Sequence, residues 1–233
     1  MNIYRSFARI LASMRKHGIS GTVRKIGRNL RKLWTIDNFD AIHGTNTKQR
    51  EWLSGLSIAS PNAKFGVQYD PTEEGELKRV FALLNVPVER FIFVDLGCGK
   101  GRTLLIAGKL GFKKVVGVEF ARELVTIAEA NLAIVKAKSA EIVHCDATEY
   151  VFPKGNIVVY MYHPFGESVL KRVVDNLSRA AAERPQASIY VVYKNPQHKA
   201  ELNSAPCLKR VETPKWTWTP DIMIWNAGGL AGA

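Results

Sequence analysis

Three carboxylates each follow a short apolar run, and this placement is typical of a ligand site. The three acids are Asp95, Glu119 and Asp146. A carboxylate at a strand end can accept hydrogen bonds from hydroxyl and amino groups, including both hydroxyls of a ribose. One such acid is often an ordinary helix cap, but three at successive strand ends predict a site for a nucleoside-like ligand.

A glycine-rich turn follows the first acid. It reads Asp95-Leu96-Gly97-Cys98-Gly99-Lys100-Gly101-Arg102. Glycines adopt backbone conformations closed to other residues and let the chain approach a ligand closely. In the dinucleotide fingerprint G-x-G-x-x-G the third glycine would stand at position 102, where this chain has arginine. An NAD-dependent oxidoreductase is therefore a minor alternative.

Apolar runs and helical patterns alternate beyond Arg90. Strands are predicted at Phe91–Asp95, Val115–Glu119, Ile142–Cys145, Ile157–Tyr162 and Ala187–Tyr193, with helices up to about Leu110, from Arg122 to about Lys136, and from Glu167 to about Glu183. Such runs predict a parallel sheet covered on both faces, whose carboxyl edge binds ligands. Leu208–Thr213 and Ile222–Trp225 have no helix between them and predict an antiparallel hairpin.

The segment Asp95–Arg102 resembles motif I of the class I S-adenosylmethionine-dependent methyltransferases. The resemblance extends over roughly Phe39–Tyr193. It implies a Rossmann-like α/β fold with a mainly parallel seven-stranded sheet, a C-terminal antiparallel hairpin and helices on both faces. The implied cofactor is S-adenosylmethionine. In that family motif I holds the amino-acid end of the cofactor, and acids at the positions of Glu119 and Asp146 receive the ribose and the adenine amino group.

Two upstream elements are similar to parts of the same family. Tyr69-Asp70-Pro71-Thr72 resembles the Y-x-P-T/S segment of non-SET lysine methyltransferases, and Gly44–Thr47 is similar to a G-x-D-T element of small bacterial methyltransferases, with Asn46 for aspartate. Thr72 is also predicted to cap the following helix. The resemblance implies cofactor contacts at Tyr69, Thr72, Asp95, Gly97, Cys98, Gly99, Gly101, Glu119, Phe120, Asp146 and Ala147.

The fourth predicted strand ends in Tyr162-His163-Pro164-Phe165. This loop partly resembles the Asn-Pro-Pro-Tyr/Phe segment of amino-group methyltransferases, in which a polar group holds the acceptor nitrogen and an aromatic ring packs on it. His163 stands where asparagine is usual. The resemblance implies that Tyr162, His163, Pro164 and Phe165 form the catalytic end of the site, with a plain turn as the alternative.

These features predict an S-adenosylmethionine-dependent methyltransferase that acts on a nitrogen, with protein lysine ahead of RNA and small molecules. An RNA-directed methyltransferase, or a non-catalytic nucleotide-binding or RNA-binding module on the same fold, is the alternative. No metal-ligand cluster is evident. The cysteines, Cys98, Cys145 and Cys207, are widely spaced and predict neither disulfides nor a zinc site.

The charge is concentrated at the start of the chain. The formal net charge is +12, and residues 1–34 contain nine basic residues and no acidic one. We predict a basic amphipathic helical arm at residues 1–36, a cap with a lead-in helix at 37–90, and a cofactor-binding catalytic domain at 91–233. The arm fits docking on its own domain, contact with an acidic RNA or membrane surface, or organellar import.

No stretch approaches the ~18 apolar residues of a membrane span, and the start of the chain does not read as a secretory signal. Since the widely spaced cysteines fit a reducing compartment, a cytoplasmic protein is expected. Trp216, Trp218 and Trp225 are predicted to pack in the core of the final hairpin rather than to stack on bases.

Overall fold

The computed structural model describes residues 37–213 and 221–228. The predicted arm, and Trp216 and Trp218, lie outside these ranges. The chain divides into two compact units, Met1–Asn38 and Phe39–Ala233. Residues 39–90 and the predicted catalytic domain belong to the same unit.

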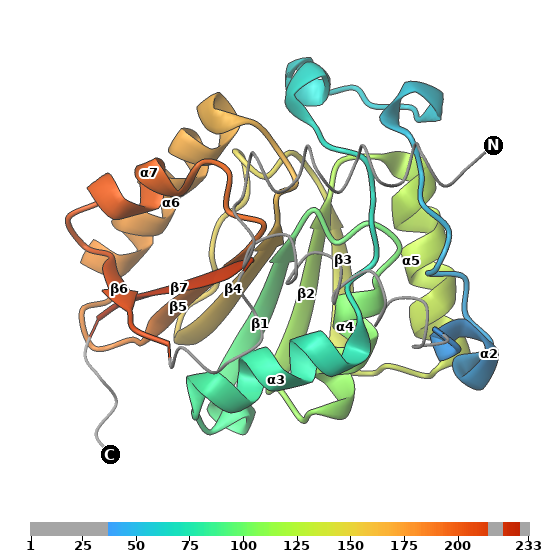
Figure 1. The fold of residues 1–233 in the computed structure, drawn as a ribbon, viewed down its shortest axis with the longest axis horizontal. Coiled ribbons are helices and arrows are strands. Elements are labelled where there is room, and N and C mark those ends of the chain that lie inside the picture. Colours follow the sequence, from blue (N-terminus) through green and yellow to red (C-terminus); the bar gives the residue numbers. More distant parts are fainter. Residues whose placement is uncertain (1–36, 214–220, 229–233) are drawn as a thin grey trace, which may run out of the picture. The chain divides into compact units, whose positions relative to one another are not determined.

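A seven-stranded sheet forms the centre of the second unit (Figure 1). Its strands are β1 (Phe91–Leu96), β2 (Lys114–Glu119), β3 (Ala140–His144), β4 (Asn156–Tyr162), β5 (Ile189–Lys194), β6 (Lys209–Val211) and β7 (Ile222–Ala227). The order is β3-β2-β1-β4-β5-β7-β6; β1 to β5 are parallel, and β7 runs antiparallel to both β5 and β6. The predicted Rossmann-like fold and terminal antiparallel pair are therefore confirmed.

Helices cover both faces of this sheet, because its strands are apolar on both sides. The helices are α2 (Phe39–His43), α3 (Glu74–Leu84), α4 (Arg102–Lys109), α5 (Arg122–Ile134), α6 (Glu167–Ala182) and α7 (Lys199–Ser204). Helices α3, α4 and α5 pack on one face and α6 and α7 on the other. Phe93 and Val94, adjacent in β1, belong to different cores because side chains alternate along a strand.

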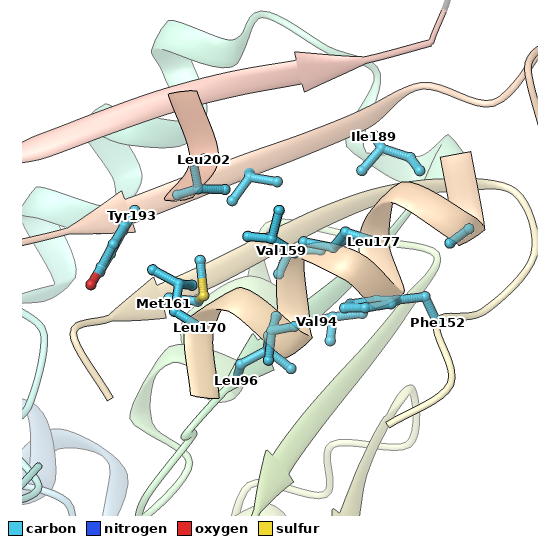
Figure 2. Packing of buried hydrophobic residues seen from close by; sticks show 14 of the residues in the cluster. Val94, Leu96, Phe152, Val159, Met161, Leu170, Leu177, Ile189, Tyr193 and Leu202 are labelled. Carbon is cyan, nitrogen blue, oxygen red and sulfur yellow. The ribbon is translucent and has the colours of Figure 1, made fainter. Parts of the chain in front are cut away.

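The core beneath α6 is built from aliphatic side chains of β1, β4 and β5 (Figure 2). Val94, Val159 and Leu177 are almost completely buried there. Burying one such side chain contributes roughly 1.5–3 kcal/mol. This packing fixes β1 and β4, whose carboxyl ends carry the glycine turn and the Tyr162 loop.

Two local expectations need correction. Helix α3 begins at Glu74 with Glu73 as its N-cap, so Thr72 does not cap it. Instead the Thr72 hydroxyl shares a 2.8 Å hydrogen bond with the hydroxyl of Tyr160. The short helix α7 was not anticipated. None of the helices in the described ranges is long and apolar enough to cross a membrane.

Candidate functional site

Asp95 lines an open cleft of about 580 Å³, a volume that includes open solvent, at the carboxyl edge of the sheet. The Asp95 side chain accepts a hydrogen bond from the Thr103 hydroxyl in the first turn of α4. Burial raises the pKa of Asp95 to about 7, the Thr103 hydrogen bond opposes this rise, and nearby Glu119 adds to it.

Glu119, at the end of β2, is tied to the backbone around it. Its carboxylate accepts N–H groups from Gly99 at 2.9 Å, Phe120 at 3.0 Å and Ala121 at 2.9 Å. Burial raises the pKa of Glu119, and these three donors oppose that rise. The acid therefore locks the glycine turn against β2 and also lines the cavity.

The rings of Tyr69 and Pro164, from two other segments, cover the glycine turn. Gly97 and Gly99 have φ angles of +79° and +53°, in the left-handed region that disfavours side chains. A Cβ on Gly99 would lie 2.0 Å from Cδ2 of Tyr69, and one on Gly97 would lie 2.5 Å from Cβ of Pro164. The turn thus needs glycine so that Tyr69 and Pro164 can close over it.

Asp146 lies in a second cavity of about 370 Å³, which shares Gly97, Glu119, Phe120 and Pro164 with the first. Its carboxylate accepts hydrogen bonds from the Ser60 hydroxyl, from Asn62 Nδ2 at 2.9 Å, and from the backbone and hydroxyl of Thr148 at 2.8 and 2.7 Å. Burial alone would raise the pKa of Asp146, but these donors outweigh it and lower the pKa. The donors occupy about all four acceptor directions of the carboxylate.

The donors Ser60 and Asn62 belong to a segment that we call the strap, residues 51–69. Figure 1 shows the strap at the edge where the parallel strands end. An antiparallel bridge between Glu51 and Tyr69 closes its base. Farther along, the N–H of Val67 donates to the carbonyl of Pro164 at 3.0 Å, so the strap also pairs with the loop after β4.

The turn Gly44–Thr47 supports the glycine turn from outside the cavity. Asp40 accepts hydrogen bonds from the hydroxyls of Thr45 and Thr47 at 2.8 and 2.6 Å. The Thr47 hydroxyl in turn accepts from Nε of the buried Arg102 at 2.8 Å, and the Tyr69 hydroxyl donates to the Thr47 carbonyl at 2.7 Å. The G-x-D-T-like element therefore positions Tyr69 and the start of α4.

Three of the four predicted residues in the loop after β4 line the cavities. Tyr162 and Pro164 line the first cavity, and Pro164 and Phe165 line the second. His163 has a φ of +39° and does not line either cavity. Its Nδ1 shares a 3.1 Å hydrogen bond with the hydroxyl of Tyr193.

The surroundings of His163 favour its neutral form. Burial lowers its pKa, and the neighbouring His198, with ring centroids 5.4 Å apart, lowers it further. A neutral ring that is bonded to Tyr193 can brace the loop between Tyr162 and Pro164.

The structure thus brings together most of the residues singled out from the sequence. Those that line a cavity are Tyr69, Thr72, Asp95, Gly97, Cys98, Gly99, Glu119, Phe120, Asp146, Ala147, Tyr162, Pro164 and Phe165. Gly101, with a φ of +81°, is the N-cap of α4 instead. Within the described ranges no group of three His, Cys, Asp or Glu side chains is arranged to hold a metal.

Sequence reasoning missed Ser60, Asn62 and Asp70 as site residues. Asn62 lines the second cavity, and Asp70 lines the first. No periodicity marks the strap, and the Ser60–Asp146 contact joins residues 86 positions apart. Asp70 lay within the Tyr69–Thr72 segment, so its position next to Tyr69 was the available signal.

Comparisons with known proteins agree with this geometry. A family model described as "Methyltransferase domain" matches residues 93–184. The chain is 32% identical over 149 residues to a protein named protein-lysine N-methyltransferase from Saccharolobus islandicus, covering 58% of this chain and 92% of that protein.

Two solved structures share the fold at lower identity. One is described as a predicted N6-adenine-specific DNA methylase from Listeria monocytogenes, with a TM-score of 0.51, 13% identity, and coverage of 68% of this chain and about half, 52%, of that chain. The YcgJ protein from Bacillus subtilis has the same TM-score and identity, with coverage of 67% of this chain and 99% of that one.

The two cavities share lining residues, carry acids at three positions and expose backbone at the glycine turn, as a site for S-adenosylmethionine requires. Buried carboxyls can accept hydrogen bonds from an ammonium group and from ribose hydroxyls, and a bound cation would lower their raised pKa. The family match, the long match to a named relative and this cavity agree. The chain belongs to the class I S-adenosylmethionine-dependent methyltransferases.

Proposed function

We propose that this methyltransferase transfers the methyl group to the side-chain nitrogen of a protein lysine. The observation that carries the proposal is the 32% identity to a protein-lysine N-methyltransferase, over 92% of that relative. The match is supported by Tyr69 and Thr72, which stand on the wall of the first cavity at the positions of the Y-x-P-T/S segment.

The cofactor roles follow from the positions of the acids. Asp95, with Thr72 and Thr103 nearby on the same cavity wall, would hold the amino-acid end of the cofactor. Glu119 would accept the ribose hydroxyls. The adenine would lie in the second cavity, where Asp146, whose acceptor directions are already filled, would position Asn62 beside it. S-adenosylmethionine supplies an electrophilic methyl on a sulfonium, and its transfer forms an N–C bond while the S–C bond breaks with its electron pair left on sulfur.

The acceptor side would be formed by Tyr69, Tyr162 and Pro164, which line the first cavity beside Asp95. An amine must lose its proton before its lone pair can attack a methyl carbon. A partly buried, aromatic wall disfavours the ammonium form and lowers the pKa of the amine. The chain's own contribution is therefore to align the amine, exclude water and disperse charge, since no strong base is required.

Product analysis tests this proposal. The purified chain is incubated with isotopically labelled S-adenosylmethionine and protein extract or lysine peptides, and the protein is hydrolysed to amino acids. Methylated lysine is expected, and Glu119→Gln should reduce its formation together with cofactor affinity. Label recovered only in RNA, in a methyl ester or on carbon would contradict the lysine assignment and leave the cofactor chemistry in place.

A further inference from the structure

Asp70, on the wall of the first cavity, is paired with an arginine that is largely exposed to solvent. Asp70 lines the cavity, and Arg50 binds its carboxylate with two hydrogen bonds, from Nε at 3.0 Å and Nη2 at 3.1 Å. The Arg50 side chain is 59% exposed, whereas that of Asp70 is 28% exposed. The bidentate geometry makes this pair stronger than most surface ion pairs, but the arginine remains largely exposed, so an incoming ammonium can exchange with it.

Tyr162 connects this acid to the interior. Its hydroxyl donates to Oδ2 of Asp70 at 3.2 Å. An ammonium of the same chain already lies over its ring, because Nζ of Lys194 is 4.0 Å from the ring centroid and is paired with Glu76 at 2.5 Å. The ring thus interacts with an ammonium in the described structure, at a distance typical of a cation–π contact.

Two other cations near this site are themselves buried. Lys194 is paired with Glu76, and the almost fully buried Lys100 is paired with Glu51 at 2.8 Å. Breaking either pair would leave a buried lysine without its counterion. Asp70 is therefore the cavity-lining acid whose charge partner, Arg50, can move into solvent at little cost.

We propose that Asp70 and the Tyr162 hydroxyl form the entry subsite for the ammonium of the acceptor lysine, and that Arg50 is a counterion which the acceptor displaces. This inference rests on the proposed lysine substrate. It assigns Asp70 and Arg50 to acceptor recognition and leaves cofactor binding to the residues already described. Removing Asp70 should weaken the acceptor, whereas removing Arg50 should strengthen it.

Steady-state kinetics with a lysine peptide at saturating cofactor separates the two effects. Asp70→Asn should raise KM for the peptide by about tenfold, the scale of a lost charge-assisted hydrogen bond. Arg50→Gln should lower KM by up to about fivefold, because the competing exposed pair is gone. Affinity for S-adenosylhomocysteine should stay within about twofold in both variants, since neither Asp70 nor Arg50 is among the residues proposed to hold the cofactor.

Matched controls come from the opposite edge of the sheet. Lys114 and Glu141 form an exposed ion pair of 2.8 Å at the beginning of β2 and β3. Lys114→Gln and Glu141→Gln change the net charge as Arg50→Gln and Asp70→Asn do. They should leave KM unchanged. Parallel shifts in these controls, or KM changes of the same sign in Asp70→Asn and Arg50→Gln, would overturn the proposal.

A binding measurement tests the subsite apart from the reaction. Butylammonium and the uncharged butanol are titrated by NMR into the full chain saturated with S-adenosylhomocysteine. Butylammonium should bind more tightly than butanol, and Asp70→Asn should remove that preference. Equal binding of the two probes would refute the subsite even if methylated lysine is formed, whereas a preference without methylated lysine would refute only the proposed substrate.

Discussion

The pKa of Asp95, raised to about 7, makes cofactor affinity depend on pH near neutrality. The free enzyme holds a proton on this carboxyl below pH 7, and the ammonium of the cofactor would favour the ionised form and lower the pKa on binding. Binding therefore releases a proton, and affinity rises as pH rises toward and through 7. At pH 6 only about one carboxyl in ten is ionised, so Kd should be about tenfold weaker than at pH 8, or about 1.4 kcal/mol.

The assay is calorimetric titration with S-adenosylhomocysteine between pH 5.5 and 8.5, in buffers of different ionisation enthalpy so that proton release is counted directly. Asp95→Asn cannot ionise, and it should bind about 10–100-fold more weakly, with the Asp95 contribution to the pH dependence gone. The variant, titrated in the same buffers, also subtracts the titration of the ligand itself. An Asp95→Asn variant that keeps the full tenfold change would refute the assignment of this proton to Asp95.

Two further predictions concern the glycine turn and its support. Gly99→Ala would bring a Cβ into Tyr69, so we expect a loss of about 1–3 kcal/mol in unfolding free energy and no measurable cofactor binding. Gly108→Ala is the control: a Cβ there meets nothing within 4 Å, so this substitution should stabilise α4 by roughly 0.5–1 kcal/mol. Asn131→Ala removes a buried side chain that bonds both Asn46 and the Lys100 carbonyl, so urea unfolding should show a loss of about 2–3 kcal/mol with an unchanged m-value; an unchanged midpoint would contradict this account.

The cofactor half of the site was predictable because it obeys local rules. Asp95 and Glu119 end apolar runs, and parallel strands bring such ends to one edge, so adjacency in space follows from periodicity. The short-range turn Gly97–Gly101 was predictable for the same reason, since backbone conformation there depends on the residues themselves.

The rest of the site was less predictable because it depends on contacts between distant segments. Tyr162 meets Asp70 across 92 positions, and Asn62 meets Asp146 across 84. His163 shows the limit most clearly. Its place in the motif indicated the cavity, but its left-handed backbone directs the ring to Tyr193 instead.

The position of β7 has a consequence for how the chain is made. Although it is the last strand in sequence, β7 lies between β5 and β6 and pairs with Ile189–Lys194 on one side and Lys209–Val211 on the other. During vectorial synthesis the five parallel strands emerge first, and β5 then presents an apolar, unpaired edge. Until residues 222–227 have left the ribosome, the nascent protein must avoid pairing of this β5 edge with other chains. All residues proposed to contact the cofactor are synthesised before residues 222–227.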